Sequence, residues 1–214
     1  MIAITLVRDT PDLVAAMRGM LPGVRVCDNG SKEPVDDAWM RIPENKYFSG
    51  GFNQAMQAIR NEGKYQWVWM LNSDVSGVSQ DMLSGLVFMA KQMNASVVSP
   101  RVPSSSWGQM HPGAFLSQSL FVDWVAPVVN VAWFVHNGGF DEQFLGWGAD
   151  VDLCYRTQQD RKIVTGHYSI HHPYGATSRR CNDYAMYQHR ETQRLLFEKH
   201  GIDIVRFAPG YFVA

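Results

Sequence analysis

The sequence lacks the clustered charges and the cysteine patterns that mark several large classes of protein. Its 214 residues carry 19 Lys and Arg against 20 Asp and Glu, a formal net charge of −1, with no long basic run. Because nucleic acids are bound through clustered positive charge, we expect no nucleic-acid partner. The three cysteines are scattered, without a CxxC spacing, and predict reduced structural thiols.

Long hydrophobic runs are also missing. The most apolar window, residues 120–135, is interrupted by Asp123, Pro127 and Asn130 and is too short to span a bilayer. The first residues, MIAITLVRDTPDLV, contain no basic region and no small-residue cleavage site, so they predict a strand rather than a signal peptide. We therefore expect a cytoplasmic protein without a transmembrane segment, for which peripheral contact with a membrane stays open.

What the sequence does contain is an alternation of apolar runs and helical patterns, in a composition that is 46% hydrophobic. Apolar runs predict strands at residues 2–7, 24–27, 66–71 and 95–100. Apolar residues at helical spacing predict helices at 11–20, after the glycine pair of GGFNQAMQAI, and after Ser79, which can cap its helix. Such alternation predicts an α/β sandwich around a mainly parallel sheet.

The pattern changes after Pro100. The segment VPSSSWGQMHPGA is rich in turn residues and predicts a mobile surface loop, in which residues 103–114 close over a bound ligand as a lid. The later half has an apolar segment at 128–135 and a strand-like KIVTGHYSIHH. A final helix is expected over about 183–200, ending at Gly201.

Polar residues follow three of the predicted strands, in the order Arg8-Asp9, Asp28-Asn29 and Asn72-Ser73-Asp74. In open α/β sheets, ligands gather at the carboxyl ends of the strands. Asp28 suits a ligand contact or an Asx turn. Asp74, with Asn72 two residues before it, offers oxygen ligands for a hard divalent cation, although a turn or cap would use the same side chain.

Other candidate residues are two histidines and a pair of acids. His171 and His172 follow a strand-like run and can supply an imidazole ligand. Asp150 and Asp152, within LGWGADVDLCYR, suit a helix-start cap, a metal site or a catalytic base. The chain has neither GxGxxG nor GxxxxGK[ST], which leaves a dinucleotide fingerprint and a P-loop without support, while its glycines permit close approach of a ligand to the backbone.

Taken in order, the segments DNGS, GGFN, LNSDV, GGFDEQFLGWGADVDLCYR and HHPYGATS resemble the inverting family 2 glycosyltransferases of the GT-A fold, especially the rhamnosyltransferase-like branch. The resemblance covers roughly residues 2–200. It implies a GT-A Rossmann-like αβα sandwich with a central, mainly parallel mixed sheet. It implies one domain over 1–214, with a nucleotide-sugar-binding half over about 1–100 and an acceptor-binding half over about 101–214.

The implied activity is that of a hexosyl- or deoxyhexosyltransferase. It would move a sugar, with inversion, from a nucleotide-sugar donor to a carbohydrate, glycolipid or protein acceptor. The resemblance implies that Asp28, Asn53, Asn72 and Ser73 bind the donor nucleotide. It also implies that Asp74 and His171, with His172 as the alternative, hold Mn²⁺ or Mg²⁺ at the donor diphosphate.

On the acceptor side, the resemblance implies that Asp150 is the general base. Trp147 and Gly148 would shape the acceptor pocket and raise the basicity of Asp150 by partial desolvation. Asp152 would lie at the acceptor or, more in keeping with its place, brace the following helix. Candidate contacts to the diphosphate are Arg101, Arg156, Arg179 and Arg180.

The sequence departs from the pattern of this family at three points, and two alternative functions stay open. Many relatives have Glu where this chain has Ala149, Asn72 is a weaker ligand than Asp, and the ending LVRDT leaves Arg8 and Asp9 unassigned. A nucleotidyltransferase-like enzyme would attack phosphorus instead, but no Gly-rich loop with a Lys is evident. A catalytically silent nucleotide- or carbohydrate-binding module is supported only by Ala149.

Overall fold

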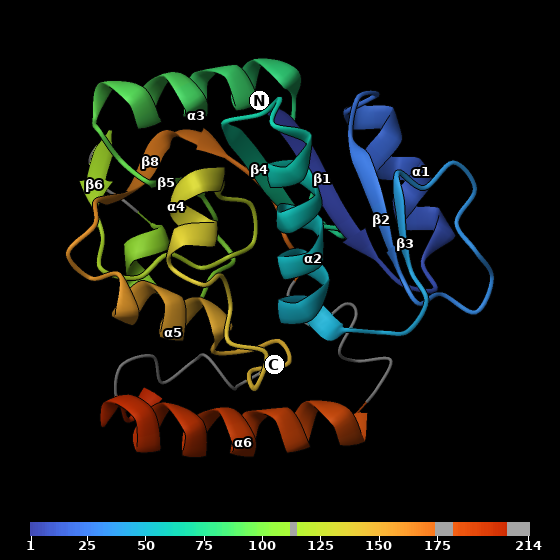
Figure 1. The fold of residues 1–214 in the computed structure, drawn as a ribbon. Helices are drawn as coiled ribbons and strands as arrows, with labels where there is room; N and C mark the ends of the chain where they lie inside the picture. The colour runs from blue at the N-terminus through green and yellow to red at the C-terminus, as the bar shows by residue number, and fades with distance from the viewer. Residues whose placement is uncertain (112–114, 174–181, 205–214) are drawn as a thin grey trace.

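The computed structural model describes residues 1–111, 115–173 and 182–204, with 182–188 described as backbone only (Figure 1). The first half contains β1 (Ile2–Val7), α1 (Pro11–Met20), β2 (Arg25–Asn29), β3 (Met40–Ile42), α2 (Tyr47–Glu62), β4 (Trp67–Asn72), α3 (Gln80–Gln92) and β5 (Val97–Arg101). The second half contains a short 3₁₀ turn η1 (Gly108–Met110), β6 (Leu116–Gln118), β7 (Val128–Asn130), α4 (Val131–His136), α5 (Ala149–Arg156), β8 (Lys162–Ser169) and α6 (Asn182–His200). The predicted alternation is confirmed; the short strands β3 and β6 were not predicted.

Within the described residues, these strands form one eight-stranded sheet in the order β3-β2-β1-β4-β7-β5-β8-β6. β7 runs antiparallel to both β4 and β5, and β6 runs antiparallel to β8, while the other pairings are parallel. Helices flank this sheet, and α6 crosses the lower side of the molecule below α5 (Figure 1). The predicted α/β sandwich with a mainly parallel sheet is therefore confirmed.

The first residues of α3 follow from local sequence, whereas those of α2 depend on packing against β1. Ser79 caps α3, because its Oγ accepts a hydrogen bond from the Met82 backbone N–H at 3.2 Å, as predicted. The glycine pair does not precede α2 but lies inside it. A Cβ on Gly51 would lie 2.6 Å from Leu6 Cδ2, so the missing side chain lets α2 pack closely on β1.

The described residues 102–111 form a partly exposed segment after β5 that is anchored by buried side chains, and the mobility expected from the sequence stays a prediction. Trp107 and Met110 in this stretch are buried at 5% and 0% exposure. The Val102 N–H donates to the Met110 carbonyl at 3.2 Å, closing the segment on itself. Its Ser, Gly and Pro content suggested mobility, whereas two large apolar anchors decide its packing; residues 112–114 of the expected lid lie outside the described residues.

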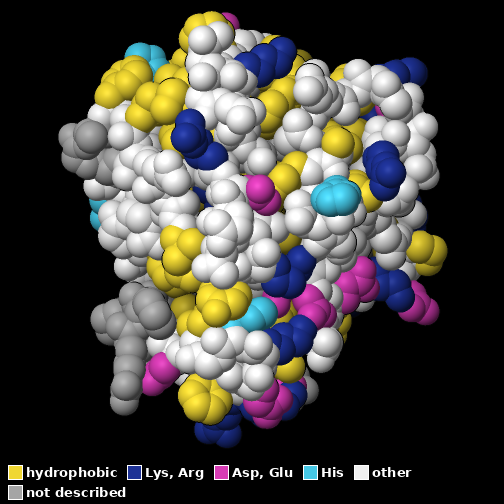
Figure 2. Space-filling model, turned by 60° about the vertical axis from the view of Figure 1, so that its left-hand side comes forward, with side chains coloured by type: hydrophobic (Ala, Val, Ile, Leu, Met, Phe, Trp, Pro, Cys, Tyr) yellow, Lys and Arg dark blue, Asp and Glu magenta, His cyan; other side chains and the backbone are white. Residues whose placement is uncertain are grey.

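The apolar segment at 128–135 forms two elements rather than one. β7 ends at Asn130, whose side chain accepts a hydrogen bond from the Trp133 N–H at 3.0 Å and caps α4. Within the described part of the chain, no helix combines the length and the apolar composition needed to cross a membrane. On the face drawn in Figure 2, Lys and Arg side chains are interspersed with Asp and Glu, and hydrophobic side chains form separate groups.

Candidate active site

The carboxyl ends of β1, β2 and β4 meet at one edge of the sheet, because these strands are parallel neighbours. The strand register places Val7 beside Asp28 and Leu6 beside Asn72. Asp28 and Asn72 therefore flank the end of β1, at the edge where ligands of open α/β sheets gather.

The loop after β4 meets the chain that follows β8. Ser76 and His171 form an antiparallel bridge, with backbone hydrogen bonds of 2.9 and 3.0 Å. The next imidazole, that of His172, turns inward, and its Nε2 lies 3.0 Å from Asp74 Oδ1 and 3.5 Å from Asn72 Nδ2. The side chains of Asp74 and His172 are each 8% exposed, whereas His171 is exposed. The structure thus brings His172, the alternative, to Asp74 instead of His171.

Asp74 and His172 have the chemistry of a divalent-metal pair. A carboxylate suits Mg²⁺ and Mn²⁺, and imidazole is a common ligand of transition metals, so the mixture favours Mn²⁺. Adjacent ligands about 2.1 Å from an octahedral cation lie about 3 Å apart, and the Asp74–His172 separation is 3.0 Å. Among the described residues, no group of three or more His, Cys, Asp or Glu side chains is placed to hold a metal. The pair therefore fits a cation whose remaining ligands come from elsewhere, such as phosphate oxygens.

Asp28 is fully buried at the end of β2. Its Oδ1 accepts from the Ser31 N–H at 2.9 Å, and its Oδ2 accepts from the Val35 N–H at 3.2 Å, which forms the Asx-type turn considered from the sequence. Arg41 donates from Nη1 to Asp28 Oδ2 at 3.2 Å and from Nη2 to the Ser31 carbonyl at 3.3 Å. The Arg41 side chain is 40% exposed, so it presents charge to solvent where Asp28 does not. The sequence did not indicate Arg41, because β3 is only three residues long.

Asn53 and Ser73, the other residues expected at the nucleotide, lie in different surroundings. The Asn53 amide donates to the Phe140 carbonyl and accepts from the Phe140 N–H, each at 2.9 Å. It also donates to Glu142 Oε1 at 3.0 Å. These contacts tie α2 to the segment before α5, whereas Ser73 lies partly exposed in the turn beside Asp74.

Asp150 lies in the first turn of α5 and is 7% exposed. Its Oδ1 accepts from the Val151 N–H at 2.9 Å, and its Oδ2 accepts from the Trp124 N–H at 3.4 Å. Burial, and then the negative charge of Asp123, raise the pKa of Asp150 to about 7. The direction of this shift agrees with the raised basicity expected from the sequence, while the contribution of Trp147 and Gly148 to it stays a prediction.

A single segment, residues 123–127, links Asp150 to the end of β4. The Met70 N–H donates to the Pro127 carbonyl and the Asn72 N–H to the Val125 carbonyl, each at 2.9 Å. The residue before Val125 is Trp124, which donates to Asp150. Adjacent residues of one segment thus contact Asp150 and Asn72.

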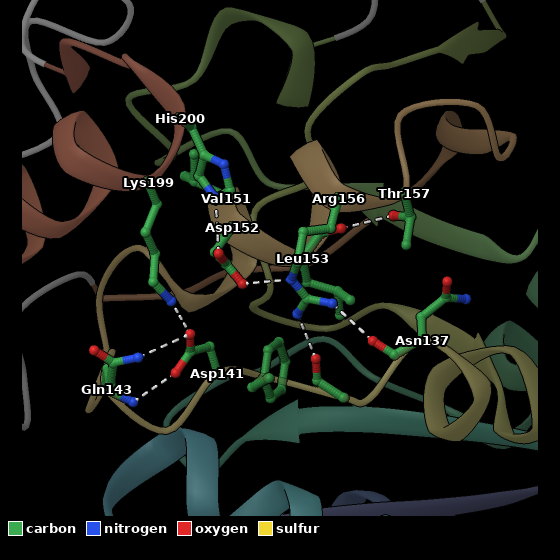
Figure 3. Close-up of polar contacts among 12 residues, drawn as sticks. Asn137, Asp141, Gln143, Val151, Asp152, Leu153, Arg156, Thr157, Lys199 and His200 are labelled. Carbon is green, nitrogen blue, oxygen red and sulfur yellow. Dashed lines mark hydrogen bonds and ion pairs between the residues drawn. The ribbon is translucent and has the colours of Figure 1, made fainter.

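Asp152 contacts side chains from two helices, Arg156 of α5 and His200 of α6 (Figure 3). It is 1% exposed; its Oδ2 accepts from Arg156 Nε and its Oδ1 contacts His200 Nε2, both at 2.8 Å. The Arg156 guanidinium also donates to the carbonyls of Asn137 and Gly139, at 2.7 Å each. Asp152 therefore joins α5 to α6, and Arg156 is engaged within the protein; Arg179 and Arg180 lie outside the described residues.

Trp147 and Gly148 directly precede α5 and contact α6. Gly148 has a φ of 84°, and a Cβ there would lie 2.5 Å from Thr192 Cγ2. The Thr192 hydroxyl donates to the Trp147 carbonyl at 2.8 Å. The indole is half-buried, with its centroid 4.2 Å from that of the His189 ring. Gly148 thus allows α6 to approach closely, and Trp147 keeps part of its ring accessible.

A hollow of about 360 Å³ lies on the far side of α6, lined by residues between Arg190 and Phe197 and by residues 202–204. None of the predicted site residues lines it. We therefore place the candidate site by the contacts of Asp74, His172 and Asp150, not by this hollow.

No family model matches the chain, and no curated protein matches it. Among solved structures, the chain is similar to GalNAc-T7 with UDP, GalNAc and Mn²⁺, with a TM-score of 0.60 and 10% sequence identity. The similarity covers 80% of this chain and 44% of that one, so this chain spans less than half the length of that protein. A likeness at this identity concerns the fold, and it confirms the GT-A Rossmann-like sandwich.

Proposed function

We propose that this chain is a metal-dependent glycosyltransferase that moves a hexosyl or deoxyhexosyl group from a nucleotide-sugar to an acceptor hydroxyl with inversion. The GT-A fold supports the transfer, and the motifs that resemble family 2 and its rhamnosyltransferase-like branch support the finer assignment. The observation that carries the proposal is that adjacent residues of segment 123–127 contact Asp150 and Asn72, and that the Asn72 side chain lies 3.5 Å from His172, the partner of Asp74.

The donor lies at the carboxyl ends of the strands. Because the similar structure of GalNAc-T7 contains UDP and Mn²⁺, a UDP-sugar with Mn²⁺ is the first donor to test. Asp74 and His172 would hold the cation, and Asn72 and Ser73 lie next to them. Bound there, the cation would stabilise the charge that develops on the leaving diphosphate. Asp28 serves the nucleotide through Arg41, whose guanidinium it orients.

Asp150 acts on the acceptor. The acceptor oxygen attacks the anomeric carbon from the face opposite the diphosphate, while the bond from that carbon to the diphosphate oxygen breaks. The hydroxyl proton passes to Asp150, and the bonding electrons leave with the nucleoside diphosphate. A carboxyl with a pKa of about 7 is a stronger base than an ordinary Asp and is still substantially ionised at neutral pH.

The acceptor side is built from the second half of the chain. Trp147, which is partly exposed and precedes Gly148 and Asp150 in the chain, offers an aromatic side chain of the kind that packs on a sugar ring. A carbohydrate, a glycolipid or a protein would present its hydroxyl there. We place the activity in the cytoplasm, in one domain of 1–214, with a donor half over about 1–100 and an acceptor half over about 101–214.

The donor is found first, by thermal stabilisation. Nucleotide-sugars are screened with Mn²⁺ and again with EDTA; a ligand at 100 times its Kd stabilises the fold by about 2.7 kcal/mol. The hit is then incubated with a panel of acceptors, and nucleoside diphosphate release is measured for the wild type, for Asp150→Asn, and for Asp81→Asn, an exposed carboxylate on α3. We expect the wild type and Asp81→Asn to release nucleoside diphosphate, and Asp150→Asn to release none.

The product decides between the remaining possibilities. NMR of the new glycosidic bond should show an anomeric configuration opposite to that of the donor, and retention would refute the single displacement. Release of pyrophosphate in place of nucleoside diphosphate would indicate a nucleotidyltransferase. Tight donor binding without hydrolysis or transfer to any acceptor would indicate a silent binding module.

A further inference from the structure

The helix α6 contacts Trp147 through two side chains on one of its faces. The His189 and Trp147 ring centroids lie 4.2 Å apart, with the ring planes tilted by 52°. The Thr192 hydroxyl donates to the Trp147 carbonyl at 2.8 Å. Because residues i and i+3 of a helix are neighbours on its surface, one face of α6 contacts both the indole and the backbone of Trp147.

This contact lies on the side of the molecule where ligands are expected. β1 runs downward from the N-terminus in Figure 1, and its neighbours β2 and β4 are parallel to it. α6 crosses the lower side of the molecule, so it lies on the side to which these strands point (Figure 1). Trp147 also lies in the segment that leads into α5 and precedes Asp150, the proposed base.

The two α6 residues restrict the orientation of the Trp147 indole. Trp147 is partly exposed, and a tryptophan side chain has two rotatable bonds, so packing must select one of its rotamers. The His189 ring packs against the indole, and Thr192 fixes the backbone from which the indole extends. Burial lowers the pKa of His189 below its usual value, so this ring is neutral at neutral pH and packs as an aromatic group.

We propose that His189 and Thr192 are positioning residues that orient the Trp147 indole to pack on a sugar ring of the acceptor. The acceptor hydroxyl is then carried by a sugar and not by an amino-acid side chain. A sugar ring has an apolar face of C–H groups, which packs on an aromatic side chain, and hydroxyl groups at its rim. The proposal rests on the proposed function for the role of Asp150, but sugar binding at Trp147 is measurable without transfer.

The test measures sugar binding at Trp147 in the absence of donor and metal. Protein labelled with 5-fluorotryptophan is followed by ¹⁹F NMR during titration with a panel of methyl glycosides and, in parallel, with a Ser- and Thr-containing peptide with blocked ends. Among the seven tryptophans, the Trp147 signal is identified by its loss in Trp147→Phe. We expect at least one methyl glycoside to shift this signal and the peptide to leave it unchanged.

Variants of α6 separate positioning from folding. In His189→Ala the Kd of the bound glycoside should rise about twofold to tenfold, as expected for the loss of one aromatic pair. His189→Phe should restore the affinity, because it returns a neutral ring. Thr192→Val removes the hydroxyl with little change of shape, so it should also weaken binding and serves if His189→Ala does not fold. Arg190→Ala, at an exposed position of the same helix, is the matched control and should bind like the wild type.

The possible outcomes separate this proposal from the proposed function. Methyl glycosides that leave the Trp147 signal unchanged overturn the proposal, and so does wild-type affinity in His189→Ala or Thr192→Val. Sugar binding at Trp147 in a protein that transfers no sugar would refute the proposed function and leave the role of His189 in sugar binding standing. In the active enzyme, His189→Ala should raise the acceptor KM and leave kcat nearly unchanged, a split that a general loss of structure would not produce.

Discussion

Replacing Asp150 by Asn should remove a destabilisation of the fold that grows with pH. The pKa of Asp150 is raised from 3.8 to about 7 in the folded protein, mainly by burial. Between these values the unfolded chain has released the proton while the folded protein still holds it. The folded state of the wild type therefore loses stability as pH rises through this window, and the loss is complete above about pH 7.

The size of the effect follows from the shift. One pKa unit corresponds to about 1.4 kcal/mol, so a rise of about three units amounts to about 4 kcal/mol in the free energy of unfolding. For a chain of this length, each kcal/mol moves Tm by roughly 2–4 °C, which gives a change on the order of 10 °C. Asn has nearly the shape of Asp and carries no charge at any pH. The difference in Tm between variant and wild type should therefore widen from pH 4 to 7 and then level off.

The assay is thermal unfolding of both proteins at half-unit steps from pH 4 to 8.5. The Asn amide cannot accept from both Val151 and Trp124, which adds a constant penalty at every pH. The test is therefore how the Tm difference between variant and wild type changes with pH, not the absolute size of that difference. A difference in Tm that stays flat across the range would show that Asp150 is ionised as easily as an ordinary Asp, and the assignment of the base would lose its physical support.

The remaining predictions concern the metal pair, the bracing carboxylate and the nucleotide. His172→Ala should lower the affinity for UDP in Mn²⁺ by more than the roughly 10- to 100-fold loss typical of residues that only support metal ligands, whereas the matched His171→Ala should not. Calorimetry with an EDTA blank is the measurement, and equal losses would refute the choice of His172 over His171. Asp152→Asn should cost about 1–3 kcal/mol in unfolding free energy, because the amide has one acceptor oxygen where the carboxylate offers two, one to Arg156 and one to His200; a normal Tm would contradict this. Arg41→Ala should weaken UDP binding by about tenfold and also lower Tm, because it leaves the buried Asp28 carboxylate without its guanidinium; calorimetry and thermal unfolding measure the two effects, and unchanged UDP affinity would remove its role at the nucleotide.

Much of the fold follows from local patterns in the sequence. The continuous apolar runs of β1 and β4 predict strands buried on both faces, and both form as expected. Ser79 and Gly201 mark helix ends that the structure confirms, Gly201 with a φ of 68°. The polar residues at strand ends are also readable in sequence, because parallel strands carry their carboxyl ends to one edge.

The insertion of β7 between β4 and β5 is not local. Its three residues follow a long irregular segment, and only hydrogen bonds to two strands from the first half make them a strand. The burial of Trp107 and Met110 likewise depends on distant partners, so composition alone predicted a mobile loop.

What the sequence by itself determined is therefore the element order, the strand ends and the pair of acids at Asp150 and Asp152. Only the tertiary structure decided which of the two histidines contacts Asp74 and which of the two acids contacts which side chain. Adjacent residues in an extended chain point in opposite directions, so His171 and His172 could not be ranked until the Ser76 bridge set the orientation. The two acids are one residue apart, yet Asp152 meets the cationic side chain of Arg156 and Asp150 meets the anionic Asp123, because each faces a different part of the folded chain. The burial of a carboxyl group and the charges near it depend on which residues are close in space. The spacing of residues along the chain does not predict these distances.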